Sequence, residues 1–160
     1  MKSRLTDNAE TMLRQFAECW KQPSANRLGR LLHEEVILKQ PNHPTIHGRN
    51  EAESYFSSLL QFVPGLHGEV DGGISKDNIL FIEWKMLFPI GTNVVVIKAV
   101  DKIIIKEDLI FERTAYFDPS KLIRATLKTP STWRRYIRFR NMVKDKTKRH
   151  LILKAPSSTQ

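Results

Sequence analysis

The sequence predicts one α+β domain, in which helices cover one face of an antiparallel sheet, followed by a basic C-terminal extension. Apolar residues recur at helical spacing through most of residues 6–61, whereas β-branched and aromatic runs dominate residues 66–117. The order of the elements is helix, helix, short strand, helix and four longer strands, which is typical of this class. The composition changes after Asp118, so we expect a domain at residues 1–118 and an extension at 119–160.

Three helices are expected in the first part of the chain. Apolar residues recur at helical spacing over residues 5–20, with Thr6 as the N-cap. Gln22-Pro23 breaks this helix, and Ser24 would cap a second, short one. A third helix is expected over residues 50–61, where one side is apolar.

The other elements of the domain are expected to be strands. A short strand over residues 36–38 comes before a proline-containing loop at 42–48, which has a brief extended piece. Four longer runs separated by turn residues then predict the main sheet, at residues 66–74, 79–88, 93–106 and 109–117.

The charges around the last hairpin predict its register. With Lys106-Glu107-Asp108 as a three-residue loop, Lys102 lies opposite Glu112 and Asp101 lies opposite Arg113, so opposite charges are paired. A two-residue loop would instead put two cations opposite each other. We therefore expect the first register, with Asp101 and Arg113 side by side on an apolar inner face. The apolar residues of that face would be Ile97, Ala99, Ile103, Ile105, Leu109, Phe111, Ala115 and Phe117.

Composition is that of a soluble globular protein, with 41% apolar and 27% charged residues. No apolar run is long enough to span a membrane and none follows the N-terminus as in a signal peptide, so we expect a cytoplasmic protein. The single cysteine, Cys19, is expected to be a small core residue and not a reactive thiol. No metal or cofactor is expected, because His33, His43, His47 and His67 lack metal-ligand spacing and no glycine-rich phosphate loop is present.

The net charge of +9 comes from the extension, because residues 1–118 sum to −2 and residues 119–160 to +11. Thr129-Pro130-Ser131 predicts the start of a helix near residues 131–146. Its apolar side would contain Trp133, Tyr136, Ile137, Phe139, Met142 and Val143. Arg140 and Lys144 interrupt that side.

Three interpretations of this helix stay open. Arginines beside aromatic residues suit contacts with nucleic acid, and a basic amphipathic helix also suits an anionic membrane surface or an acidic protein. In both cases the candidate polyanion-binding residues are Arg134, Arg135, Arg138 and Arg140. In the third interpretation, the apolar side packs on the domain or on a dimer mate and leaves a solvated basic face.

Four motifs resemble, in order and spacing, the nuclear transport factor two-like superfamily, which includes ketosteroid isomerases and SnoaL-like polyketide cyclases. The motifs are at residues 31–36, 44–49, 83–84 and 115–118, and the resemblance covers residues 6–118. It implies a cone-shaped domain in which a curved sheet wraps against three helices and encloses a mostly apolar pocket. It also implies a homodimer, because members of this superfamily commonly form one.

The resemblance further implies where catalytic groups would lie. Ketosteroid isomerases use a tyrosine on the first helix, a carboxylate base after the first strand and an aspartic acid on a later strand. These positions fall on Phe16, Gln40 and Asp101, so ketosteroid isomerisation is not expected without the hydroxyl and the base. Arg113 stands where the family usually keeps an apolar residue, and its charge would favour the ionised form of Asp101.

Two functions are left open. In the first, a SnoaL-like domain binds a small, mostly apolar or carbonyl-containing ligand, with or without isomerase- or cyclase-type proton transfer. Asp101 and Arg113 are then the candidate catalytic residues, with Arg113 on a carboxylate, phosphate or enolate oxygen. The pocket walls would include Phe16, Trp20, Gln40, Tyr55, Trp84 and Phe117. Glu83 is a further candidate acid, and a structural ion pair is the other interpretation of Asp101 and Arg113.

The second function is a non-catalytic binding or assembly module in which the extension makes the functional contact. Since one fold supports many functions, side chains inside the cone must decide between the two.

Overall fold

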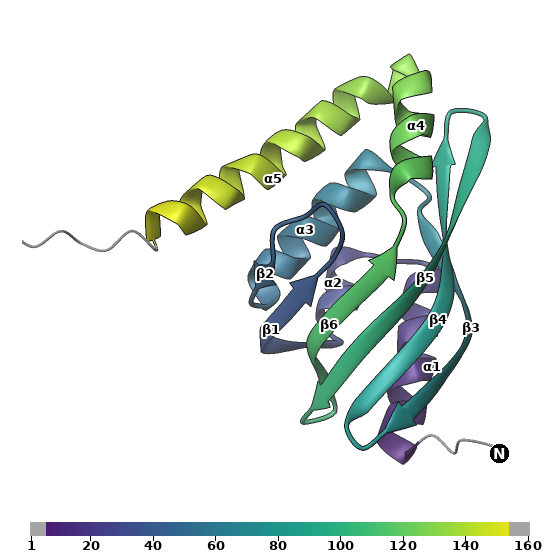
Figure 1. Ribbon diagram of the computed structural model, residues 1–160, viewed down its shortest axis with the longest axis vertical. Helices are drawn as coiled ribbons and strands as arrows, with labels where there is room; N and C mark the ends of the chain where they lie inside the picture. Colours follow the sequence, from purple (N-terminus) through teal and green to yellow (C-terminus); the bar gives the residue numbers. More distant parts are fainter. Residues whose placement is uncertain (1–5, 154–160) are drawn as a thin grey trace, which may run out of the picture.

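The computed structural model describes the backbone of residues 6–153 and the side chains of residues 6–145. Three helices, α1 (Asp7–Lys21), α2 (Ala25–Gly29) and α3 (Arg49–Phe62), lie against one face of a curved sheet (Figure 1). The strands are β1 (Leu32–Lys39), β2 (Ile46–His47), β3 (His67–Lys76), β4 (Ile79–Ile90), β5 (Asn93–Lys106) and β6 (Leu109–Phe117). The extension forms α4 (Ser120–Lys128), a 3₁₀ turn (Pro130–Thr132) and α5 (Trp133–Leu153). The predicted α+β cone with a helical extension is confirmed.

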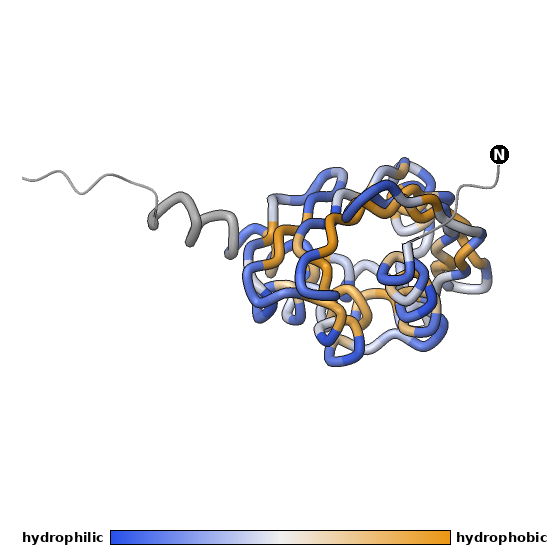
Figure 2. The backbone as a smooth tube through the Cα atoms, turned by 90° about the horizontal axis from the view of Figure 1, so that it is seen from below, coloured by the Kyte–Doolittle hydropathy of each residue, from blue (hydrophilic) through white to orange (hydrophobic). Residues whose placement is uncertain are grey.

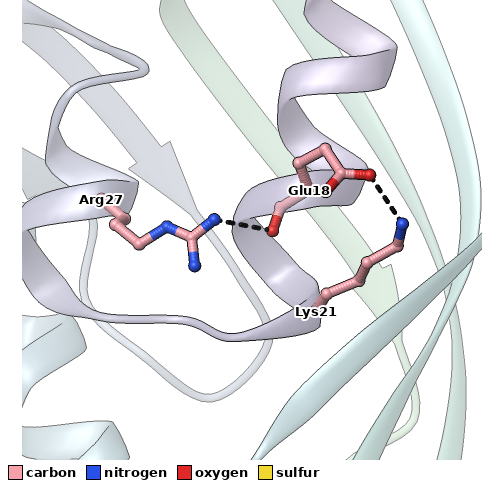
Figure 3. A network of polar contacts seen from close by, with 3 residues as sticks. All are labelled: Glu18, Lys21 and Arg27. Carbon is pink, nitrogen blue, oxygen red and sulfur yellow. Dashed lines mark hydrogen bonds and ion pairs between the residues drawn. The ribbon is translucent and has the colours of Figure 1, made fainter.

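The first two helices begin at the predicted caps. The Thr6 hydroxyl accepts a hydrogen bond from the Ala9 amide, and the Ser24 hydroxyl accepts one from the Arg27 amide. Arg27 then joins the two helices, because its guanidinium donates to the carbonyl oxygen of Glu18 at 3.1 Å (Figure 3). The Glu18 carboxylate accepts from Lys21 on the other side, at 2.6 Å.

The sheet has the order β2-β1-β6-β5-β4-β3 and is not wholly antiparallel. The strands β3 to β6 are joined by short turns, so each is antiparallel to its neighbour. β1 and β6 pair in parallel, which corrects the expected antiparallel sheet. One helix and four strands separate them in the chain, and a connection of that length permits parallel pairing.

The last hairpin corrects the predicted register. Its loop has two residues, Glu107 and Asp108, both with positive φ (53° and 60°), as a type I′ turn requires. A bulge next to Ile105 then shifts the pairing, so that Lys102 lies opposite Thr114 and Asp101 opposite Ala115. Because of this shift Ile110 is buried, whereas Leu109 and Phe111 are only partly buried.

Despite this register, the Asp101 and Arg113 side chains meet on the inner face. Arg113 lies opposite Ile103, two residues along the strand from Asp101, so the two charged residues are diagonal neighbours. Glu83 is exposed on the outer face, which removes it as an acid inside the cone.

The core lies between the sheet and the helices, and hydrophobic residues occur on both (Figure 2). The rings of Trp20 and Trp84 pack with centroids 4.9 Å apart. Gly68 permits this packing, because a Cβ there would lie 2.7 Å from the Trp84 ring. Cys19 is partly buried, and burial raises the pKa of its thiol, consistent with an unreactive residue.

The aromatic side of α5 packs on α3. The Phe62 and Phe139 rings are stacked at 5.3 Å, and Tyr136 lies 5.5 Å from Phe62. The packing of α5 on the domain is incomplete, since Trp133 and Ile137 are 46% and 55% exposed. Among the helices within residues 6–153, none is both long and apolar enough to cross a membrane.

Candidate functional site

A cavity of about 500 Å³ lies inside the cone, bounded by α3, the inner face of the sheet and the extension. Most of its wall is apolar and aromatic. Its polar or cationic side chains include Gln40, Asn42, His43, Tyr55, Arg113, Thr126, Tyr136, Arg140 and Lys144. No aspartate or glutamate lines this cavity, so within the described part of the chain its charged groups are all cationic.

Arg113 is the buried charge of the cavity. β6 places it on the inner face, where its side chain is 8% exposed and its Nε donates to Asp101 Oδ2 at 2.5 Å. The guanidinium carbon lies 5.6–5.8 Å from the ring centroids of Phe16, Trp20 and Trp84. Three aromatic faces and a carboxylate therefore fix its position.

The Asp101–Arg113 contact leaves hydrogen-bonding capacity on both sides. Within the described residues, Arg113 donates only through Nε, so its two terminal nitrogens have no protein acceptor. Asp101 is fully buried, and its Oδ1 has no hydrogen-bond partner within this part of the chain. Because Asp101 does not line the cavity and Arg113 does, a ligand would meet the arginine and not the carboxylate.

Tyr55 and Gln40 form a second polar region of the wall. Burial raises the pKa of Tyr55 to about 12, against the opposing influence of the Arg113 charge and the nearby Gln40 amide. Tyr55 is therefore a neutral hydroxyl at physiological pH. The ring of His43 lies 4.6 Å from that of Tyr55, and His43 Nδ1 donates to the Pro44 carbonyl at 2.7 Å.

Two buried polar atoms of the lining residues lack partners in the described chain. They are Gln40 Nε2, from the segment after β1, and Thr126 Oγ1, from α4. A buried donor without a partner costs about 1–3 kcal/mol.

α5 adds two cations to the cavity lining, Arg140 and Lys144. The guanidinium of Arg140 lies over the Tyr136 ring, 5.8 Å from its centroid. Arg134, Arg135 and Arg138 do not line this cavity. The structure thus separates Arg140 from the other arginines that we expected to bind a polyanion.

The structure brings together four of the six expected wall residues, Trp20, Gln40, Tyr55 and Phe117. Phe16 and Trp84 do not line the cavity and lie behind the Arg113 guanidinium. The sequence reasoning missed His43, Thr126 and the cavity-facing cations of α5. The signal for the cations was present, since Arg140 and Lys144 interrupt the apolar side of a helix.

Within the described residues, no group of three or more histidine, cysteine, aspartate or glutamate side chains is arranged to hold a metal ion. The site combines an arginine surrounded by aromatic rings, a neutral phenol, a histidine and two cations at the edge of the cavity.

Comparison with known proteins agrees with this architecture. The SnoaL-like domain family matches residues 13–113. A comparison with curated proteins finds no match. Among solved structures, a hypothetical protein with a ketosteroid isomerase-like fold from Catenulispora acidiphila DSM 44928, in complex with trimethylamine, has a TM-score of 0.66 at 14% identity, covering 71% of this chain and 90% of that chain.

Two further structures show the same fold. A candidate SnoaL-like polyketide cyclase from Jannaschia sp. CCS1 has a TM-score of 0.63 at 16% identity, covering 74% of this chain and 90% of that one. TerC, co-crystallised with polyporic acid, has a TM-score of 0.67 at 8% identity, covering 74% and 98%. With a family match over most of the cone, the chain belongs to the SnoaL-like domain family.

Proposed function

We propose that this protein binds a small, mostly apolar molecule with an acidic group, and that Arg113 holds that group. The observation that carries the proposal is the placement of Arg113, a buried guanidinium with free terminal nitrogens on a cavity that no described carboxylate lines. A planar guanidinium binds carboxylate, phosphate or enolate oxygens through two parallel hydrogen bonds.

The rest of the cavity suits the apolar part of such a ligand. Its volume of about 500 Å³ is in the range of small-molecule sites, and aromatic side chains from α1, α3, β6 and α5 line it. The Gln40 and Thr126 side chains add polar character to this wall. Two solved structures of this fold carry small molecules, trimethylamine and polyporic acid, which supports small-ligand binding as a use of the cone.

Binding without isomerisation is the form of this function that we favour. The resemblance puts Phe16 and Gln40 at the positions of the isomerase hydroxyl and base, and Glu83 is exposed on the outer face. Asp101 contacts Arg113 and lies behind the cavity wall, so it is not placed to take a proton from a ligand.

A proton-transfer enzyme is the second candidate, and His43 is the observation in its favour. With Nδ1 donating to Pro44, the other ring nitrogen of neutral His43 is an acceptor, and the residue lines the cavity. Tyr55 and Arg113 would then bind the enolate oxygen. Loss of turnover in His43→Gln with retained ligand binding would favour this enzyme over the binding protein.

Native mass spectrometry of the purified protein tests the proposal. We expect a small acidic molecule to co-purify with the wild type and to be lost in Arg113→Met. Arg134→Met is the matched control, since it removes the same side chain at an exposed position. Equal retention of the ligand in Arg113→Met and in the control would contradict the role of Arg113.

We also propose a homodimer formed through the outer face of the sheet. Five large apolar residues of β4, β5 and β6 are 38–56% exposed there: Phe81, Val94, Val96, Val100 and Tyr116. Apolar residues gathered on an exposed sheet face often mark a protein interface. Sedimentation velocity should give a dimer that Val100→Lys dissociates, and a monomeric wild type would contradict the proposal.

A further inference from the structure

The extension forms part of the ligand cavity and is not only an appendage. α5 runs past α3 in Figure 1, and its Tyr136 and Phe139 rings contact Phe62. These aromatic contacts fix the side of α5 that faces the cone. Arg140 and Lys144 follow on that side, four residues apart, and both line the cavity.

These two cations lie at the solvent-exposed edge of the cavity, on the side of α5 that carries its aromatic contacts. Like charges four residues apart on one side of a helix destabilise it. Neither Arg140 nor Lys144 forms an ion pair with another described side chain. A pair of like charges that no described partner compensates breaks a local rule, and such departures often mark a functional position.

The charges that line the cavity indicate which ligand group would pair with Arg140 and Lys144. Arg113 has Asp101 as its counter-ion, whereas Arg140 and Lys144 have none among the described residues. One acidic group on Arg113 would leave both cations of α5 uncompensated. A second acidic group at the far end of the ligand would neutralise them.

We propose that Arg140 and Lys144 form a second anion-binding subsite, and that the preferred ligand is an apolar molecule with two acidic groups. One group would bind Arg113 inside the cone, and the other would bind α5 at the edge of the cavity. This inference rests on the proposed function and adds the class of ligand. The family match ends at residue 113, so the second subsite lies outside the residues that match the family.

Titration of the full chain with two aromatic probes tests the inference. The probes are biphenyl monocarboxylate and biphenyl dicarboxylate, and isothermal titration calorimetry gives the dissociation constants. For the wild type we expect the dicarboxylate to bind about tenfold more tightly, the size of one charge-assisted contact. Added salt should reduce this preference, because Arg140 and Lys144 are solvent-exposed.

The variants separate the second subsite from general charge. The double substitution Arg140→Gln/Lys144→Gln should abolish the preference for the dicarboxylate and leave monocarboxylate binding within about threefold. The double substitution Arg134→Gln/Arg138→Gln changes the net charge equally on the same helix, and it should keep the preference. An equal loss in both double variants, or an unchanged preference in the first, would overturn the second subsite.

Arg113→Met and Asp101→Leu/Arg113→Met test the proposed function separately. Each variant should bind each probe at least tenfold more weakly than the wild type does. The double variant tests this without leaving an unpaired carboxylate in the core. If Arg113 is required but the cations of α5 are not, only the second subsite fails. If neither probe binds the wild type, or if both bind the Arg113 variants equally well, the proposed function fails and the inference fails with it.

Discussion

Replacing Arg113 by methionine would leave the carboxylate of Asp101 in the core without its ion-pair partner. Asp101 is 0% exposed, and the Arg113 side chain is 8% exposed. Water therefore cannot easily solvate the carboxylate once the guanidinium is gone. Removing one partner of a buried pair costs about 3–5 kcal/mol, and we expect a loss of that size in the free energy of unfolding.

This loss would be a large part of the stability of a small domain, which is about 5–15 kcal/mol. Urea unfolding at neutral pH, followed by circular dichroism, gives the free energy of unfolding for each variant. The matched control is Lys39→Met. Lys39 pairs with Glu112 at 2.9 Å, but its side chain is 45% exposed, so removing it should cost less than about 1 kcal/mol.

The double variant Asp101→Leu/Arg113→Met shows where the loss comes from. Apolar replacement of a whole buried ion pair is often neutral or stabilising, so we expect the double variant to lie within about 1 kcal/mol of the wild type. If Arg113→Met costs no more than Lys39→Met, the pair is not desolvated as argued. If the double variant is as unstable as the single one, the loss comes from the aromatic contacts of the guanidinium and not from the unpaired charge.

Three further predictions concern the wall and the extension. Because the pKa of Tyr55 is raised to about 12, the folded state holds this proton more tightly than the unfolded chain. The resulting contribution to stability is complete below about pH 10 and is lost at about 1.4 kcal/mol per pH unit as the pH rises to about 12. A Tyr55→Phe variant should not show this loss, and an equal fall in its stability over the same range would contradict the assignment. Phe139→Ala should lower the free energy of unfolding by about 1–2 kcal/mol and speed amide hydrogen exchange in α5. Ile137→Ala is the control, because Ile137 is 55% exposed and its replacement should change stability by less than about 0.5 kcal/mol. Equal effects of the two substitutions would argue against the docking of α5. If the exposed arginines bind polyanions, Arg134→Gln/Arg138→Gln should elute from heparin at lower salt than the wild type, and retention that does not depend on salt would exclude this role.

The sequence alone determined the class of fold and most element positions, because these depend on local patterns. Helical spacing and the caps at Thr6 and Ser24 located α1 and α2, and β-branched runs located β3 to β6. It also indicated that Asp101 and Arg113 meet, since both lie on the inner side of alternating strands. That outcome is confirmed although the predicted register was wrong.

Only the tertiary structure decided the register and the make-up of the cavity. The register depends on a bulge beside Ile105 and on positive φ at Glu107 and Asp108, which charge pairing does not report. The parallel pairing of β1 with β6 joins strands far apart in the chain. Arg140 lines the cavity because aromatic contacts between α3 and α5 fix the orientation of that helix, and such contacts form between segments that no local pattern connects.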